Sequence, residues 1–197
     1  MAEKIYLVRH GETLWAKEGK HTGLTDIPLT KQGIKEAVLL GKRLKKNSFD
    51  AIYSSPLLRA VSTAEYAGFS KKIEIWDDLV EWDYGIYEGL THAEIFKKDP
   101  HWSIFTKGAP QGESVAMVER RVRRILKRLR SIKGNVLLFS SGHISRSLAA
   151  KWLNLSIKEG AHFALSPASL SLLGFERTTP AFLLWNDISH LNIFLRI

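Results

Sequence analysis

The sequence contains no cysteine, which excludes disulfide bonds and zinc sites built on thiolate ligands. It also lacks any apolar run close to the roughly 18 residues that a membrane-spanning helix needs. The first residues lead directly into a short apolar segment, without the charged region and long apolar stretch of a signal peptide. These absences predict a soluble, cytoplasmic protein with no membrane partner.

The chain does contain enough apolar material for a substantial core. Of its 197 residues, 45% are hydrophobic, an amount typical of one domain of this length. No internal repeat or low-complexity tract divides the sequence. We therefore expect a single domain over residues 1–197 with an inserted flap near 77–112, and the oligomeric state, including a homodimer, stays open.

The net charge of +9 raises the question of nucleic-acid binding. Much of the charge falls in two predicted helices, around residues 31–46 and 120–133. In the second region, apolar residues recur at helical spacing and leave most arginines and lysines on the other face, as in a solvated surface helix. These apolar residues are Val115, Val118, Val122, Ile125, Leu126 and Leu129. No nucleic-acid-binding signature accompanies them, so nucleic acid is not the expected partner, although nonspecific attraction to polyanions stays open.

Short apolar runs alternate with helical patterns along the chain. Strands are predicted over residues 5–8, 49–53, 72–76, 136–139, 170–175 and 181–185, and helices over 30–46, from 56 onward, 113–131 and 144–153. This alternation predicts an α/β protein with a mostly parallel sheet covered by helices on both faces.

The remaining segments are predicted to be loops. Residues 15–29 have no sustained period and predict an ordered loop, and residues 178–180 predict the last turn. Residues 77–112 predict a long excursion with a short helix near 93–98, which we expect to cover a site. A close approach of the helix over 30–46 to the sheet would explain Gly41 in its interior.

Polar groups follow three of the predicted strands. Arg9 and His10 come where the first strand becomes a loop, Arg59 follows Ser54-Ser55-Pro56, and His143 ends the segment Ser140-Ser141-Gly142-His143. Carboxyl ends of parallel strands meet at one edge of a sheet, where α/β proteins place their ligands. A cation beside an imidazole suits the binding and attack of a phosphoryl group. The alternative is that Arg9 and His10 merely cap a strand in solvent.

Five motifs in this chain resemble those of the histidine phosphatase superfamily, the phosphoglycerate-mutase-like proteins. They are R-H-G-E-T at 9–13, H-T-G-L-T-D-I-P-L-T at 21–30, S-S-P-L-L-R-A at 54–60, E-W-D-Y-G-I-Y-E-G at 81–89 and G-E-S-V at 112–115. The resemblance implies a three-layer α/β/α sandwich whose flap lies over the carboxyl edge of the strands. It also implies a phosphohistidine intermediate that needs no metal and no cofactor. Within the superfamily, the sequence looks most like small broad-specificity acid phosphatases and sugar-bisphosphate phosphatases.

The resemblance also implies roles for single residues. His10 matches the nucleophile, Arg9 and Arg59 match the arginines that bind the phosphoryl oxygens, and Glu81 matches the general acid. Asp83 and Glu88 compete with Glu81 for the last role, and Arg59 could instead form a structural ion pair. Thr22 and Gly23 match a segment that lines the phosphate pocket with its backbone, and Tyr84 lies in the motif that carries Glu81.

One position departs from the family pattern. The superfamily ordinarily has a second histidine directly after the strand that ends at Ser140, followed by glycine, but here Ser141 precedes Gly142. Serine offers a hydrogen bond of shorter reach and no charge. Either His143 substitutes for the missing imidazole, or Ser141 suffices with lower activity, or the protein binds phosphates without efficient turnover.

The expected function is a phosphomonoesterase that acts on a small phosphorylated metabolite through His10. The alternatives are a phosphoglycerate-type mutase and a phosphate-binding protein with weak turnover. Ala16 stands where the mutases have an asparagine, and the segment 90–112 contains only three lysines, Lys97, Lys98 and Lys107. Both features favour a phosphatase over a mutase.

Overall fold

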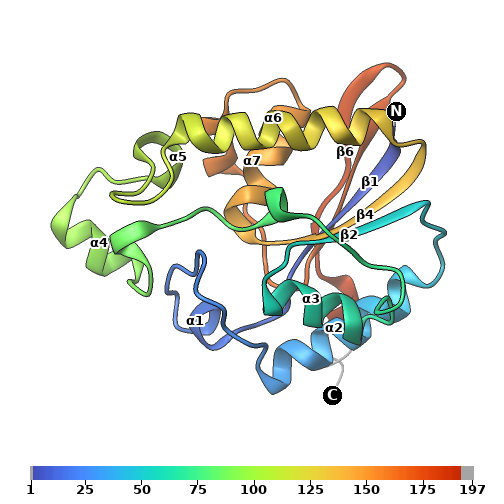
Figure 1. The fold of residues 1–197 in the computed structure, drawn as a ribbon, viewed down its shortest axis with the longest axis horizontal. Helices are drawn as coiled ribbons and strands as arrows, with labels where there is room; N and C mark the ends of the chain where they lie inside the picture. Colours follow the sequence, from blue (N-terminus) through green and yellow to red (C-terminus); the bar gives the residue numbers. More distant parts are fainter. Residues whose placement is uncertain (1, 192–197) are drawn as a thin grey trace.

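Six strands form one sheet between two layers of helices (Figure 1). The computed structural model describes residues 2–191. Its strands are β1 (Ala2–Arg9), β2 (Ala51–Ser54), β3 (Glu74–Ile75), β4 (Gly134–Ser140), β5 (Leu170–Glu176) and β6 (Thr179–Asp187). Their order in the sheet is β3-β2-β4-β1-β5-β6, and the first four are mutually parallel. The predicted mostly parallel α/β sheet is therefore confirmed.

The last two strands are antiparallel to their neighbours. A turn at Arg177 and Thr178 joins them, with Arg177 in the left-handed region at φ 56°. The predicted turn at 178–180 was thus wrong by one to two residues. Pro180 lies inside β6, which is possible because β6 is the edge of the sheet and a proline there need not donate a ladder hydrogen bond.

The two faces of the sheet hold two separate cores. Helices α6 (Val115–Ser131) and α7 (Gly142–Trp152) cover one face, and α2 (Lys31–Leu44) and α3 (Leu58–Tyr66) cover the other (Figure 1). Successive side chains of a strand point to opposite faces. In β1, Ile5 and Leu7 pack with apolar residues of α6 and α7, whereas Tyr6 and Val8 pack with those of α2 and α3. This double burial explains the continuous apolar run that predicted the strand.

The flap at residues 77–112 extends from the carboxyl end of the sheet (Figure 1). It contains η1 (Asp77–Leu79), η2 (Gly85–Tyr87), α4 (His92–Lys98) and α5 (Ile104–Lys107). The predicted helix near 93–98 is confirmed as α4. The other pieces are three or four residues long, too short to produce a hydrophobic period. The flap's buried aromatic side chains give it a core: Trp82, Tyr84, Tyr87, Trp102 and Phe105.

Two expectations about local structure were wrong. Residues Leu14–Lys17 form the short helix α1 inside the predicted loop, because the Thr13 side chain accepts a hydrogen bond from the Ala16 N–H and caps it. Gly41 meets α3 rather than the sheet, since a Cβ at Gly41 would lie 2.4 Å from the carbonyl oxygen of Ala67. The remaining short element is η3 (Ile157–His162).

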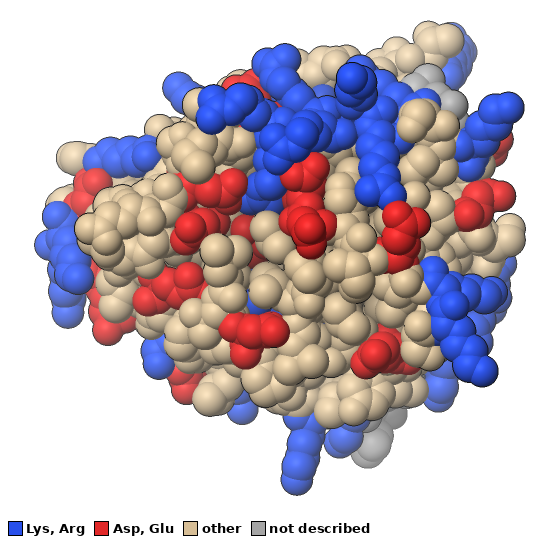
Figure 2. All heavy atoms as spheres, in the orientation of Figure 1, with Lys and Arg blue, Asp and Glu red and all other residues tan. Residues whose placement is uncertain are grey.

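The basic residues of α6 gather on the face drawn in Figure 2, with acidic residues beside them. Arg124 pairs with Asp78 at 2.6 Å and Arg128 with Glu74 at 2.5 Å, so two of these arginines tie α6 to the segment that begins the flap. Among residues 2–191, no helix combines the length and the apolar character needed to span a membrane.

Candidate active site

The carboxyl ends of β1 and β4 and the start of the flap surround a pocket of about 70 Å³. Seven of the predicted site residues line it: Arg9, His10, Thr22, Glu81, Tyr84, Gly142 and His143. Arg59, Gly23 and Ser141 lie behind this lining. The sheet topology thus brings together groups from four separate motifs.

His10 is fixed as a neutral imidazole. Its ring is buried, with 4% of its surface exposed, and Nδ1 lies 2.8 Å from the carbonyl oxygen of Gly11. A carbonyl accepts only, so Nδ1 holds the proton and Nε2 keeps its lone pair. Burial and then the charges of Arg59 and Arg9 hold the pKa of His10 well below its ordinary value. The ring therefore stays neutral and nucleophilic in mildly acidic solution.

Arg9 and Arg59 are both held by backbone carbonyl oxygens. Arg9 Nη1 donates to Leu165 at 2.5 Å, and Arg59 donates to Gly23 at 2.7 Å and Thr25 at 3.0 Å. Within the described part of the chain, no carboxylate pairs with either guanidinium, and neither Nε has a hydrogen-bond partner. The structural ion pair considered for Arg59 is therefore absent among residues 2–191. Both charges remain for an anionic ligand.

The loop that holds Arg59 is fixed by the flap. The carboxylate of Glu88 accepts hydrogen bonds from the backbone N–H of Gly23 at 2.8 Å and of Thr25 at 2.7 Å. A Cβ at Gly23 would lie 2.7 Å from the carbonyl oxygen of Trp82, so only glycine fits there. Gly23 therefore positions Arg59 and does not line the pocket, which corrects the expectation for this residue.

The Glu81 carboxylate lies at the N-terminus of α7. Oε1 accepts hydrogen bonds from the N–H groups of Trp82 at 2.9 Å and Ile144 at 2.8 Å, and Oε2 accepts one from His143 at 2.9 Å. Helix N-termini stabilise carboxylates in this way. The side chain of Asp83 instead accepts from the Gly85 N–H at 2.8 Å. Of the three candidate carboxylates, only Glu81 lines the pocket.

The start of α7 joins the two halves of the pocket. A Cβ built on Gly142 would lie 3.5 Å from Cζ of Arg9 and 3.6 Å from Oε2 of Glu81. Ser141, the N-cap residue, is completely buried, and its Oγ has no hydrogen-bond partner among the described residues. The carbonyl oxygen of the preceding residue, Ser140, accepts a hydrogen bond from the His10 N–H at 2.9 Å. Ser141 therefore lies next to the end of the strand that carries the nucleophile, and its hydroxyl is a polar group without a partner there.

His143 lines the pocket and is held by contacts with Tyr84 and Phe105. Its Nδ1 lies 2.5 Å from the Tyr84 hydroxyl and 3.9 Å from Oε2 of Glu81, and its ring packs against Phe105 at 5.3 Å between centroids. Burial raises the pKa of Tyr84 well above its ordinary value, so the hydroxyl keeps its proton. This hydrogen bond fixes the His143 ring against Tyr84, and the tautomer of His143 sets which of the two groups donates.

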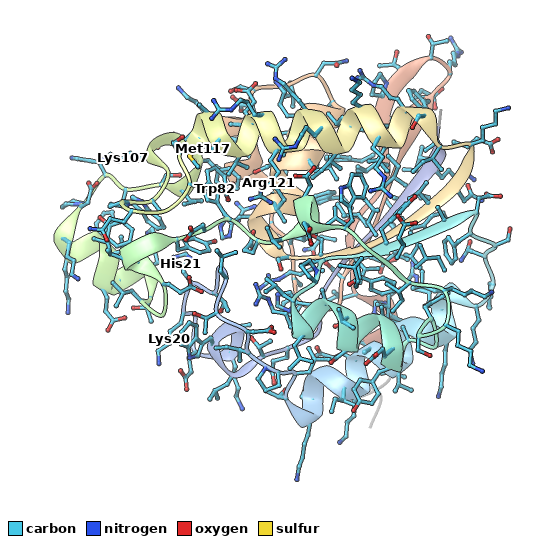
Figure 3. All side chains as sticks on the ribbon, in the orientation of Figure 1. Lys20, His21, Trp82, Lys107, Met117 and Arg121 are labelled. Atoms are coloured by element: carbon cyan, nitrogen blue, oxygen red, sulfur yellow. The ribbon has the colours of Figure 1, made fainter. Side chains whose placement is uncertain are left out.

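The sequence analysis did not single out Arg121, nor four residues of the pocket lining, Lys20, His21, Arg146 and Leu165. Arg121 is buried and donates to the carbonyl oxygens of Val80 at 2.6 Å and Glu81 at 3.3 Å, so it holds the backbone of the general-acid candidate from α6. The sequence did indicate that Arg121 is buried, because it falls within the row of apolar residues of α6. His21 and Arg146 line the pocket. Figure 3 shows Arg121 and Trp82 beneath α6 and His21 on the segment after α1.

This combination of fold and pocket defines a phosphatase that works through a histidine. The chain belongs to the histidine phosphatase superfamily, branch 1, whose family model matches residues 5–188. The resemblance and the enzyme class inferred from the motifs are thereby confirmed, as is the fold.

Individual relatives agree with this assignment. An acid phosphatase of Mycobacterium tuberculosis is 41% identical over 88% of this chain and 87% of its own. A sedoheptulose 1,7-bisphosphatase of Saccharomyces cerevisiae is 29% identical over 81% of this chain and 70% of its own. The solved structure of a Mycobacterium tuberculosis open reading frame matches with a TM-score of 0.87 and 37% identity, covering 93% of this chain and 97% of that one.

Proposed function

We propose that this phosphatase hydrolyses phosphomonoesters through a phosphoryl group carried on Nε2 of His10. The observation that carries the proposal is the orientation of His10, with Nδ1 on the Gly11 carbonyl and Arg9 and Arg59 beside the ring. The fixed proton leaves one nitrogen ready to attack, and the two guanidinium groups offset the charge that repels a nucleophile from a phosphate dianion.

The proposed reaction has two steps. Nε2 of His10 attacks phosphorus and the bond to the alcohol oxygen breaks, while Glu81 gives its proton to that oxygen. A water molecule then attacks the phosphohistidine, Glu81 takes a proton from it, and inorganic phosphate leaves. Oε2 of Glu81 accepts only one hydrogen bond in the structure, so it has a lone pair for this proton. General acid–base catalysis of this kind contributes about 10²- to 10⁴-fold to the rate.

Ser141 takes over part of the missing histidine's role in this proposal. Its buried hydroxyl, which has no hydrogen-bond partner among the described residues, would donate a hydrogen bond to the transferring phosphoryl group. Loss of one preorganised donor commonly lowers the rate by about 10²- to 10³-fold. We therefore expect a working enzyme that is slower than relatives with the second histidine.

The pocket favours hydrolysis over a mutase reaction. Ala16 lines the pocket where the mutases carry asparagine. Of the three lysines in the segment 90–112, Lys107 pairs with Asp99 at 2.6 Å and lies at the outer edge of the flap (Figure 3). None of the three flap lysines lines the pocket, so they offer no equivalent of the basic insertion that holds a bisphosphate cofactor in the mutases.

Rapid acid and base quenching of the enzyme with a labelled phosphomonoester tests the proposal. We expect an adduct that is stable in base, labile in acid and absent in His10→Ala. A wild type without the adduct, together with unchanged hydrolysis by His10→Ala, would refute it. Stoichiometric phosphate binding without turnover would instead support the phosphate-binding alternative that Ser141 suggests.

A further inference from the structure

Arg146 places a third guanidinium group in the pocket. It lies in the second turn of α7, and its Nε and Nη2 donate to the carbonyl oxygens of Gly160 and Ala161, both at 2.9 Å. Its Cζ lies over the Phe105 ring, 4.7 Å from the ring centroid. Among residues 2–191, no carboxylate pairs with Arg146 and no acceptor lies on Nη1. Two carbonyl oxygens thus hold the guanidinium group in place, while its Nη1 and its positive charge stay available for a ligand.

Arg146 lies beside His143 in the pocket lining. Phe105 contacts both side chains, with its ring centroid 5.3 Å from that of His143 and 4.7 Å from Cζ of Arg146. Burial and then the charges of Arg146, His21 and Arg9 lower the pKa of His143, whereas burial and then Arg59 and Arg9 lower that of His10. Arg146 therefore belongs with His143 and Glu81 in the pocket.

The position of Glu81 tells which part of a substrate reaches Arg146. In the proposed reaction Glu81 protonates the leaving oxygen, so the phosphoryl group lies toward His10 and the alcohol extends the other way. Nδ1 of His143 is 3.9 Å from Oε2 of Glu81. The alcohol of the substrate therefore extends toward His143 and Arg146.

We propose that Arg146, beside His143 in the pocket lining, forms a second anion subsite, which binds an acidic group on the alcohol part of the phosphomonoester. The inference rests on the proposed function. The group is a carboxylate or a second phosphate, because both offer the paired oxygens that a planar guanidinium binds. Glu81 is the nearest opposing charge that acts on Arg146, but it makes no ion pair with it among residues 2–191, so an acidic group on the substrate would be the first direct partner of this guanidinium.

Paired substrates that differ in one acidic group test this subsite. O-phosphoserine and O-phosphoethanolamine differ by a carboxylate, and fructose 1,6-bisphosphate and fructose 1-phosphate differ by a phosphate. For wild type we expect the acidic member of at least one pair to have a kcat/KM about tenfold higher or more, the size expected for a charge-assisted hydrogen bond. The pair that shows the preference identifies the acidic group.

Variants connect the preference to Arg146. In Arg146→Gln the ratio of kcat/KM within the pair should fall to within about threefold of unity. Arg146→Lys keeps the charge and should retain part of the preference. Arg123→Gln is the matched control, because Arg123 is an exposed arginine of α6 outside the pocket. Arg123→Gln should leave the kcat/KM ratio of both substrate pairs unchanged.

A wild type without preference in either pair, or a preference that survives in Arg146→Gln, would overturn the subsite. If Arg146→Gln does not fold, the kcat/KM ratios of wild type and of Arg146→Lys decide whether the subsite exists. If no compound is hydrolysed, the proposed function fails, and dissociation constants of the same pairs, measured by calorimetry on wild type and Arg146→Gln, test the subsite alone by the same ratios.

Discussion

Ser141→Ala should make the protein more stable and less active at the same time. The Ser141 hydroxyl is completely buried and has no hydrogen-bond partner among residues 2–191. Although Ser141 is the N-cap of α7, its side chain makes no capping bond, so alanine removes no existing interaction. An unpaired buried hydroxyl costs about 1–3 kcal/mol. Its removal should therefore raise the free energy of unfolding by a similar amount.

The loss of activity follows from the charge on the transferring phosphoryl group. A hydrogen bond to a charged group is worth about 1.5–3 kcal/mol, which corresponds to a fall in kcat/KM of about tenfold to hundredfold. The gain in stability corresponds to a rise in melting temperature of about 2–4 °C per kcal/mol for a chain of this size. The assay is steady-state hydrolysis of p-nitrophenyl phosphate, with a thermal melt of each variant.

Ser145→Ala provides the matched control. Ser145 lies one turn further along α7, and its hydroxyl is also buried without a partner in the described residues. Its replacement should give a comparable rise in melting temperature and leave kcat/KM unchanged. If Ser141→Ala keeps wild-type activity, or if both variants lose activity equally, the hydroxyl of Ser141 does not serve the reaction and our reasoning about this position is wrong.

Three further predictions concern other parts of the molecule. Ser141→His restores the family's second imidazole and should raise kcat by about a hundredfold; no gain in the same assay would count against this explanation of the slow rate. Burial lowers the pKa of His21 from 6.5 to about 4. Between these two pH values His21 is protonated in the unfolded chain and neutral in the folded chain. The melting temperature should therefore fall from pH 6.5 toward pH 4, and less steeply in His21→Phe. Gly41→Ala should lower the melting temperature although alanine favours helix by about 1 kcal/mol, because its Cβ would lie 2.4 Å from the Ala67 carbonyl oxygen; an unchanged melt would contradict this contact.

The sequence predicted the strand ends well because each lies where an apolar run meets a small or polar residue. Arg9, His10 and Glu81 line one pocket, as their motifs implied. Periodicity could not predict α1, a helix of four residues whose existence depends on one capping hydrogen bond from Thr13. It also could not predict that Gly41 faces α3, because spacing along one helix says nothing about which neighbour approaches it.

The buried arginines were the harder part of the site. Arginine is mostly found at surfaces, so a sequence reading assigns it to solvent. Arg121 departs from this rule because three backbone carbonyl oxygens and Glu113 surround its guanidinium. The carbonyls come from the start of the flap, 40 to 43 residues earlier in the chain, and only tertiary structure brings them to α6.

The arginines of the pocket are anchored by carbonyl oxygens and not by carboxylates. This explains how the pocket can be rigid and still attract an anion. Arg9, Arg59 and Arg146 are each oriented by backbone acceptors that carry only partial charge. A carboxylate partner would hold the side chains equally well, but it would cancel the field that the substrate needs. The one carboxylate in the lining, Glu81, is itself bound to three backbone N–H groups. The backbone therefore orients these three arginines and Glu81, whereas Lys20, also in the lining, pairs with the carboxylate of Glu18. The arginine charges stay available for the phosphoryl group and the alcohol attached to it.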